Sequence, residues 1–103
     1  MEKNEILSSI KSQILKVVPG ARVMLFGSRA YGNPTVESDW DILILTSQPV
    51  TAILKRSIHD ILFPTSVSIA AFINTLTVQE NDWQKNPNYY TLHQSISDKL
   101  IEL

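Results

Sequence analysis

Two aspartates, Asp39 and Asp41, stand one residue apart at the start of the apolar segment DWDILIL (39–45). Side chains alternate across a strand, so both carboxylates point to one face and Trp40 points to the other. Two carboxylates this close repel each other, which is costly unless a cation neutralises them or one carboxyl keeps its proton. Mg²⁺ prefers carboxylate oxygen and keeps waters that it exchanges for substrate phosphates. The pair therefore predicts a magnesium site and phosphoryl or nucleotidyl transfer.

Gly27 and Ser28 precede this pair, separated from it by a spacer of ten residues. A glycine directly after a predicted strand, here ARVMLF (21–26), lets a ligand approach the backbone closely. If Ser28 begins a helical turn, the free N–H groups of that turn bind an anion and the hydroxyl adds a donor. Arg29 could add positive charge. Together these residues predict a phosphate cradle beside the metal site, as a nucleoside triphosphate requires.

Each of these features has an ordinary explanation when it is taken alone. An isolated Asp-x-Asp is more often turn chemistry, Gly-Ser a simple turn, Arg29 a surface charge and Trp40 a packing residue. The combination of strand, Gly-Ser, spacer, Asp-x-Asp and buried strand favours the chemical interpretation.

The elements that must position these residues follow from the spacing of apolar residues and from the turn signals. Helices are predicted over 5–18, 51–62 and about 89–101, a helical turn from Ser28 to Gly32 and a short helix from 77 to about 85, with strands over 21–26, 39–45 and 66–73. Pro64 is expected to end the helix over 51–62. The order α-β-β-α-β-α predicts an α/β or α+β fold, a mixed sheet flanked by helices.

Length and composition set the frame. A chain of 103 residues with 44% apolar residues predicts one globular domain over residues 1–103. Nine basic residues against ten acidic ones give no general electrostatic case for nucleic acid. The chain has no cysteine, no signal-peptide pattern and no apolar run of membrane-spanning length. We therefore expect a soluble, cytoplasmic protein with no membrane partner.

The segment LFGSRAYGNPTVESDWDILIL (25–45) resembles a known family. Its Gly-Ser, ten-residue spacer and SDWD (38–41) resemble the signature of the nucleotidyltransferase superfamily typified by DNA polymerase beta. The segment is particularly similar to the minimal nucleotidyltransferases of bacteria and archaea, which are single-domain proteins of about this length. The signature covers about a fifth of the chain, and the order of the elements extends the match weakly over the rest. The resemblance implies a mixed sheet flanked by helices, with the active site at its edge.

The resemblance also implies roles for individual residues. Asp39 and Asp41 would be catalytic and bind Mg²⁺, and Gly27, Ser28 and Arg29 would bind the nucleotide. The implied reaction transfers a nucleoside monophosphate, often AMP from ATP, to an acceptor hydroxyl, and pyrophosphate leaves. Minimal members are frequently paired with a small helical partner called HEPN. In those pairs the nucleotidyltransferase is the antitoxin, and some members adenylylate a tyrosine of the partner.

The sequence departs from the family at a further carboxylate, which the family carries on the following strand as a general base or second-metal ligand. The predicted strand SVSIAAFI (66–73) has no acid, and Ser68 takes the corresponding position. The nearest acids in the sequence are Asp60, Glu80 and Asp82. Three functions therefore stay open: an active nucleotidyltransferase, a binding module of the same fold that has lost turnover, and a structural domain without a ligand.

The other chemically capable residues carry weaker signals. His59, His93, Lys55 and Arg56 are expected on solvated helix faces, whereas Trp83, Tyr89 and Tyr90 either pack in the core or form a surface for a partner.

Overall fold

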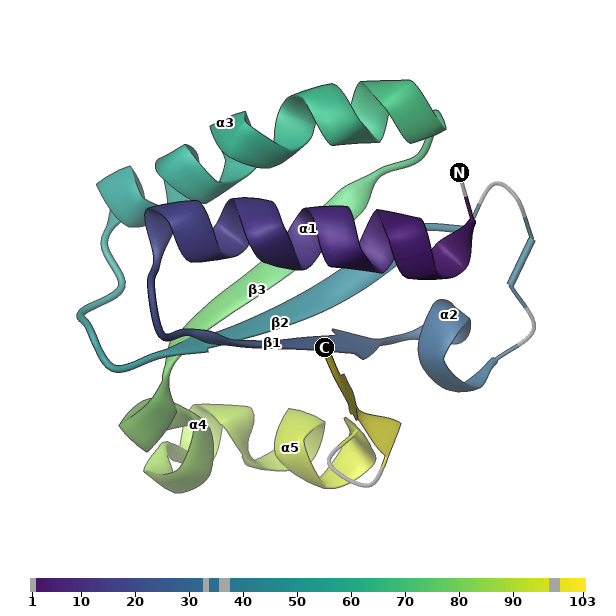
Figure 1. Ribbon diagram of the computed structural model, residues 1–103. Coiled ribbons are helices and arrows are strands. Elements are labelled where there is room, and N and C mark those ends of the chain that lie inside the picture. Colours follow the sequence, from purple (N-terminus) through teal and green to yellow (C-terminus); the bar gives the residue numbers. More distant parts are fainter. Residues whose placement is uncertain (1, 33, 36–37, 97–98) are drawn as a thin grey trace.

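The structure is a computed structural model that describes residues 2–32, 34–35, 38–96 and 99–103. The elements in chain order are α1 (Lys3–Val17), β1 (Arg22–Phe26), α2 (Ser28–Tyr31), β2 (Trp40–Thr46), α3 (Ala52–Ile69), β3 (Ile73–Gln79), α4 (Glu80–Lys85), the 3₁₀ turn η1 (Pro87–Tyr89), α5 (Tyr90–Ile96) and β4 (Ile101–Glu102). Helices α1 and α3 cover one face of the sheet, and α4 and α5 lie on the other (Figure 1). The predicted mixed sheet flanked by helices is confirmed.

Within the described residues, the sheet has four strands in the order β3-β2-β1-β4. Strand β1 runs antiparallel to both β2 and β4, whereas β2 and β3 are parallel and joined by α3. The register pairs Phe26 with Asp41 and Asp41 with Asn74. The end of β1 and the starts of β2 and β3 therefore meet at one edge of the sheet, and the predicted site residues collect there.

The side chains of β2 alternate between two apolar layers, and this alternation determines to which face of the sheet Asp41 points. Trp40, Ile42 and Ile44 pack with α1 and α3, whereas Leu43 and Leu45 pack toward α4. Burying a side chain of this size contributes roughly 1.5–3 kcal/mol, so a shift of the strand by one residue would be very costly. Asp41 shares the parity of Leu43 and therefore points to the α4 side of the sheet.

The prediction that Pro64 ends its helix is wrong, because α3 continues through Pro64 to Ile69. Pro64 is exposed, so water can pair with the Asp60 carbonyl that has lost its N–H partner. Leu62 and Thr65 on the inner face are buried, and Gln13 Nε2 donates to Thr65 Oγ1 at 2.7 Å. Packing of this inner face offsets the cost of about 3 kcal/mol for an interior proline.

The strand predicted over 66–73 is wrong for the same reason. Residues 66–69 belong to α3, and β3 begins at Ile73 after the left-handed Ala70 (φ 54°) ends the helix. The helix predicted from 77 is shorter than expected, since β3 runs through Gln79 and α4 starts at Glu80.

The C-terminal region also differs from the predicted single helix. Helix α5 ends at Ile96, residues 97–98 lie outside the described residues, and residues 101–102 form β4 against β1. Arg22 Nη2 donates to Glu102 at 2.9 Å, and the Leu103 N–H donates to the Val23 carbonyl at 2.8 Å. Two residues of strand carry too little periodicity to be recognised without this pairing. In the described ranges, every helix is too short or too polar to cross a membrane.

Candidate active site

Asn74 joins the two aspartates at the edge of the sheet. Its side-chain nitrogen Nδ2 donates to Asp39 Oδ2 at 2.9 Å and to Asp41 Oδ1 at 3.2 Å. The amide thus lies against both carboxylates and supplies partial positive charge where they would repel each other. Among the described residues, no group of three or more His, Cys, Asp or Glu side chains could hold a metal. The site is therefore built from two carboxylates and one amide.

Asn74 is not among the residues that the sequence pattern predicts for the site, because the predicted strand over 66–73 lies too early along the chain. Ser68, which the resemblance places at this position, is exposed on α3. The signal was present in INTLTVQ (73–79), which is rich in β-branched residues and alternates between the two faces of the sheet. Asn74 shares its face with Leu76 and Val78, which pack in the same layer as Leu43.

Gly27 is required by the close approach of Asp41. Its backbone adopts φ 76° and ψ −163°, a region that is essentially limited to glycine. A Cβ at this position would overlap Asp41 Oδ2. Gly27 therefore lets the Asp41 carboxylate pack directly on the backbone at the end of β1.

Ser28 is the first residue of the short helix α2 and is exposed. The Ala30 N–H bonds the Gly27 carbonyl at 3.0 Å, and the Gly32 N–H bonds the Ser28 carbonyl at 2.9 Å. The predicted turn from Ser28 to Gly32 is thus present. It follows Gly27 directly, so its start adjoins the carboxylate that packs on Gly27.

Arg29 lies between α2 and the start of β2. Its guanidinium donates to the carbonyls of Ser38 and Thr35 and lies 4.1 Å from the centroid of the Trp40 ring. Its predicted role in nucleotide binding stays a prediction.

The acids that are close in sequence lie elsewhere in the fold. Asp60 lies on the exposed face of α3, 3.8 Å from Arg56. Glu80 pairs with Arg22 at 3.1 Å and follows β3, six residues beyond Asn74, which is roughly 20 Å along a strand. Asp82 lies further on, in the first turn of α4. None of these acids occupies the place beside Asp39 and Asp41 that Asn74 fills.

A family model described as a nucleotidyltransferase domain matches residues 4–93. The chain belongs to this family. The match includes Gly27, both aspartates and Asn74, and it agrees with the resemblance to minimal nucleotidyltransferases of the polymerase beta-like superfamily. Membership supports nucleotidyl transfer as the general activity. No curated protein matches the chain significantly.

The residues of this nucleotidyltransferase site fit one divalent cation. Asp39 and Asp41 supply carboxylate oxygens, and their shared contact with an N–H group marks a place that favours positive charge. Turning the Asn74 amide would present its Oδ1 instead of Nδ2, and amide carbonyls are accepted ligands of hard cations. The donor set thus has two negative charges and one neutral oxygen.

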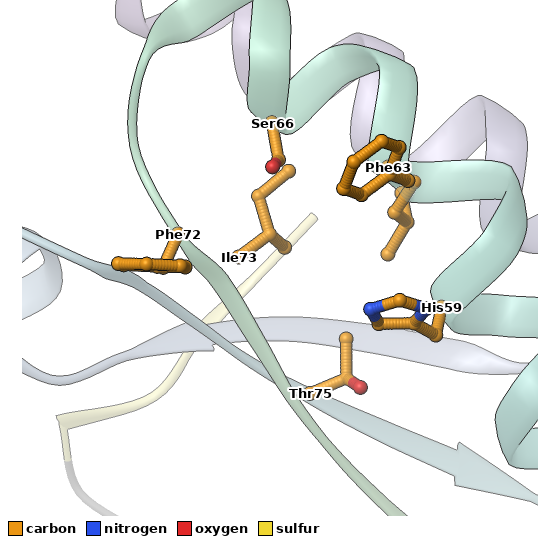
Figure 2. A pocket seen from close by; sticks show the side chains of 7 residues that line it. His59, Phe63, Ser66, Phe72, Ile73 and Thr75 are labelled. Atoms are coloured by element: carbon orange, nitrogen blue, oxygen red, sulfur yellow. The ribbon is translucent and has the colours of Figure 1, made fainter.

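A separate apolar pocket of about 120 Å³ lies between α3 and β3. Figure 2 shows His59, Phe63 and Ser66 reaching from α3 toward Ile73 and Thr75 of β3. Ile73 packs with the α1 and α3 layer, so this pocket opens on the opposite side of the sheet from Asn74. The pocket is not part of the carboxylate site.

The aromatic residues near the C-terminus divide between core and surface. Trp83 is buried and contacts the rings of Tyr89 and His93, with centroids 6.1 and 5.1 Å away. Tyr90 is exposed. The core interpretation is therefore confirmed for Trp83 and does not hold for Tyr90.

Proposed function

We propose that this domain transfers a nucleoside monophosphate, AMP from ATP, to a hydroxyl of a protein acceptor in an Mg²⁺-dependent reaction. The observation that carries the proposal is the pairing of Asp39 and Asp41 through Asn74, directly beside Gly27. When bound, Mg²⁺ would neutralise charge on the triphosphate and on the departing pyrophosphate.

In this proposal the Gly27 backbone and the Ser28 hydroxyl hold the β- and γ-phosphates, while Asp39 and Asp41 hold the cation. The acceptor oxygen forms a bond to the α-phosphorus. The bond from that phosphorus to the oxygen bridging to the β-phosphorus breaks, and pyrophosphate leaves with the electron pair. The hydroxyl proton passes to an aspartate or to water, because the amide of Asn74 is not a base.

We further propose that the acceptor is a tyrosine of a small helical HEPN-type protein and that this domain is the antitoxin of the pair. The family resemblance supports this proposal. An exposed apolar surface supports a protein partner in general. It comprises Phe63, Val67 and Phe72, whose exposed fractions are 56%, 63% and 74%. We call these three residues the α3/β3 patch.

The test uses the protein with ATP labelled at the α-phosphorus, Mg²⁺ and a small helical HEPN-type protein as the acceptor. We expect label on the partner, and a loss of about 10²-fold or more in rate for Asp41→Asn, which removes charge at constant size. Asp60→Asn is the matched control, because Asp60 is an exposed acid outside the site. Absence of label with both wild type and control, at any metal concentration, contradicts the proposal.

A binding module without turnover is the second candidate, and two observations favour it. The β3 side chain that lies beside both aspartates is the Asn74 amide, which cannot serve as a base. Phe63 and Phe72 of the α3/β3 patch line the pocket between α3 and β3 (Figure 2), which opens on the face of the sheet away from Asn74. Such a protein would neutralise its partner by contact alone.

Two variants separate the candidates. The double substitution Asp39→Asn and Asp41→Asn removes the charge of the site, whereas Phe72→Ser changes only the α3/β3 patch. If the double variant still neutralises the partner and Phe72→Ser does not, the binding module is supported. If the double variant binds the partner but no longer neutralises it, transfer is required and the binding module is contradicted.

A further inference from the structure

Arg29 contacts the chain on both sides of Asp39. Its Nε and Nη2 donate to the Ser38 carbonyl at 3.0 and 2.8 Å. Its guanidinium carbon lies 4.1 Å from the centroid of the Trp40 ring. Ser38 and Trp40 immediately precede and follow Asp39, so one side chain contacts the backbone carbonyl before this residue and the ring of the residue after it.

The contact with Trp40 ties this restraint to the core. Trp40 is 3% exposed and packs in the layer under α1 and α3, and its N–H donates to the Phe72 carbonyl at 2.9 Å. The ring is therefore a fixed platform, and a cation over its face is attracted by the ring quadrupole. The Ser38 carbonyl belongs to the peptide bond between Ser38 and Asp39. The two guanidinium N–H groups that donate to it therefore orient that peptide bond relative to the Trp40 ring.

The same side chain connects the two halves of the proposed site. Arg29 belongs to α2, whose first residue is Ser28. Its Nη2 also donates to the Thr35 carbonyl at 3.1 Å, and the Thr35 N–H donates to Ser38 Oγ at 2.9 Å. The end of the connection from α2 to β2 is thus held by the helix that carries the predicted phosphate-binding residues.

We propose that Arg29 is a positioning residue that orients Asp39 for cation binding through the Ser38 carbonyl and the Trp40 ring. The cation-binding part of this inference rests on the proposed function, whereas the restraint on the backbone stands on the geometry alone. The inference differs from direct nucleotide binding in the chemistry that it requires. A planar guanidinium can donate twice to one carbonyl while lying on a ring, and a lysine ammonium cannot. A phosphate, by contrast, accepts lysine as a point charge.

The experiment compares Arg29→Lys and Arg29→Gln with Arg56→Lys and Arg56→Gln in the full chain. Arg56 is the matched control, because its side chain is 82% exposed on α3. The first measurement is the affinity for Mn²⁺ alone, without nucleotide. The second is amide hydrogen exchange at Trp40 without metal. The third is ATP affinity in the presence of a chelator.

We expect Arg29→Lys to weaken Mn²⁺ binding by about 10- to 100-fold, as for other residues that orient metal ligands. Exchange at Trp40 should become about tenfold faster, because the platform and the carbonyl are no longer joined. The ATP affinity measured in the presence of a chelator should stay within about twofold of wild type, since the inference gives Arg29 no contact with a phosphate. The Arg56 variants should match wild type in all three measurements.

Two results overturn the inference. One is unchanged Mn²⁺ affinity and Trp40 exchange in Arg29→Lys, together with weaker ATP binding in Arg29→Gln, which identifies a phosphate ligand. The other is faster exchange with unchanged Mn²⁺ affinity, which shows that the restraint does not orient Asp39 for the cation. If wild type binds no Mn²⁺, the proposed function fails, and exchange at Trp40 alone then supports or overturns the restraint. If Arg29→Gln does not fold, Arg29→Lys carries the comparison.

Discussion

Asn74 stands opposite Asp41 in the parallel pair of β2 and β3, and its Nδ2 donates to Asp41 Oδ1 at 3.2 Å. The same nitrogen donates to Asp39 Oδ2 at 2.9 Å. One neutral amide therefore stabilises two adjacent carboxylates without a cation. The amide cannot accept a proton from a substrate. Asn74 therefore stabilises the two neighbouring carboxylates but cannot act as a general base.

Asn74→Asp should lower the stability of the protein without metal and make its stability depend on Mg²⁺. The substitution removes the donor and adds a like charge, so we expect a loss of about 1–3 kcal/mol in unfolding free energy without metal. Added Mg²⁺ should restore the melting temperature by mass action. If transfer is limited by the missing base, the rate should rise by about 10²-fold or more. Thermal unfolding with and without Mg²⁺ measures the first two effects.

Asn81→Asp is the matched control for that substitution, because Asn81 is exposed on α4. It should leave both stability and its Mg²⁺ dependence unchanged. Equal behaviour of the two variants would show that Asn74 has no special relation to the aspartates.

Gly27→Ala should damage both the fold and the site. The backbone at Gly27 is in a region that other residues avoid, at a cost of about 1–3 kcal/mol, and the new Cβ would overlap Asp41 Oδ2. We expect lower unfolding free energy in urea and loss of nucleotide binding. Gly20→Ala is the control, because Gly20 also has a positive φ of 82° but has open space where the new Cβ would lie. Gly20→Ala should cost stability and leave nucleotide binding intact.

Pro64→Ala should stabilise the protein. The substitution restores an N–H for the Asp60 carbonyl inside α3, and a helix interior favours alanine over proline by up to about 3 kcal/mol. We expect an increase of about 1–3 kcal/mol in unfolding free energy in urea. Pro87→Ala is the comparison, because Pro87 begins η1, where proline is favourable. A decrease for Pro64→Ala would mean that α3 is not continuous through this residue.

Docking of β4 should weaken in acid. The Arg22 guanidinium, which hydrogen-bonds Glu102, lowers the pKa of Glu102, and Lys11 adds a smaller effect in the same direction. Arg22 also binds Glu80. Because the pKa of Glu102 is lower in the folded protein than in the unfolded chain, the ion pair stabilises the fold at pH values above the ordinary glutamate pKa of about 4.3. This stabilisation is lost as the pH falls through the lowered folded pKa.

Amide exchange at Leu103, whose N–H bonds the Val23 carbonyl, measures this docking. Exchange should quicken below about pH 4 beyond the intrinsic pH dependence. The effect should be small, because the ion pair is exposed. Glu102→Gln should remove the acid-dependent step, and an unchanged step in this variant would assign it to another group.

The part of the site that lies in one continuous segment was predictable from the sequence. Gly27, Ser28 and the two aspartates follow one another within fifteen residues, and their types report local requirements: a positive φ, a helical turn and a pair of charges at the start of a buried strand. The sheet flanked by helices was predictable as well, because apolar periodicity records which face of each element is buried.

The C-terminal half of α3 and the start of β3 were not predictable in this way. Pro64 is a local signal that a helix ends. The burial of Leu62 and the hydrogen bond between Gln13 and Thr65 outweigh this signal. Because α3 continues to Ile69, β3 begins at Ile73, later than predicted, and Asn74 lies near its start. A local signal worth about 3 kcal/mol can be outweighed by buried contacts that join residues far apart in the sequence.

The sequence alone therefore determined the family, the fold class and the aspartate pair, because each depends on neighbouring residues or on periodicity along one element. Only the packed chain placed the Asn74 amide against both carboxylates and the Arg29 guanidinium against the two neighbours of Asp39, the Ser38 carbonyl and the Trp40 ring. Asn74 reaches Asp41 through a strand register set after a helical crossover, and Arg29 reaches Trp40 through a turn and a connection. Such contacts depend on how whole elements pack, and no spacing within a single element encodes them.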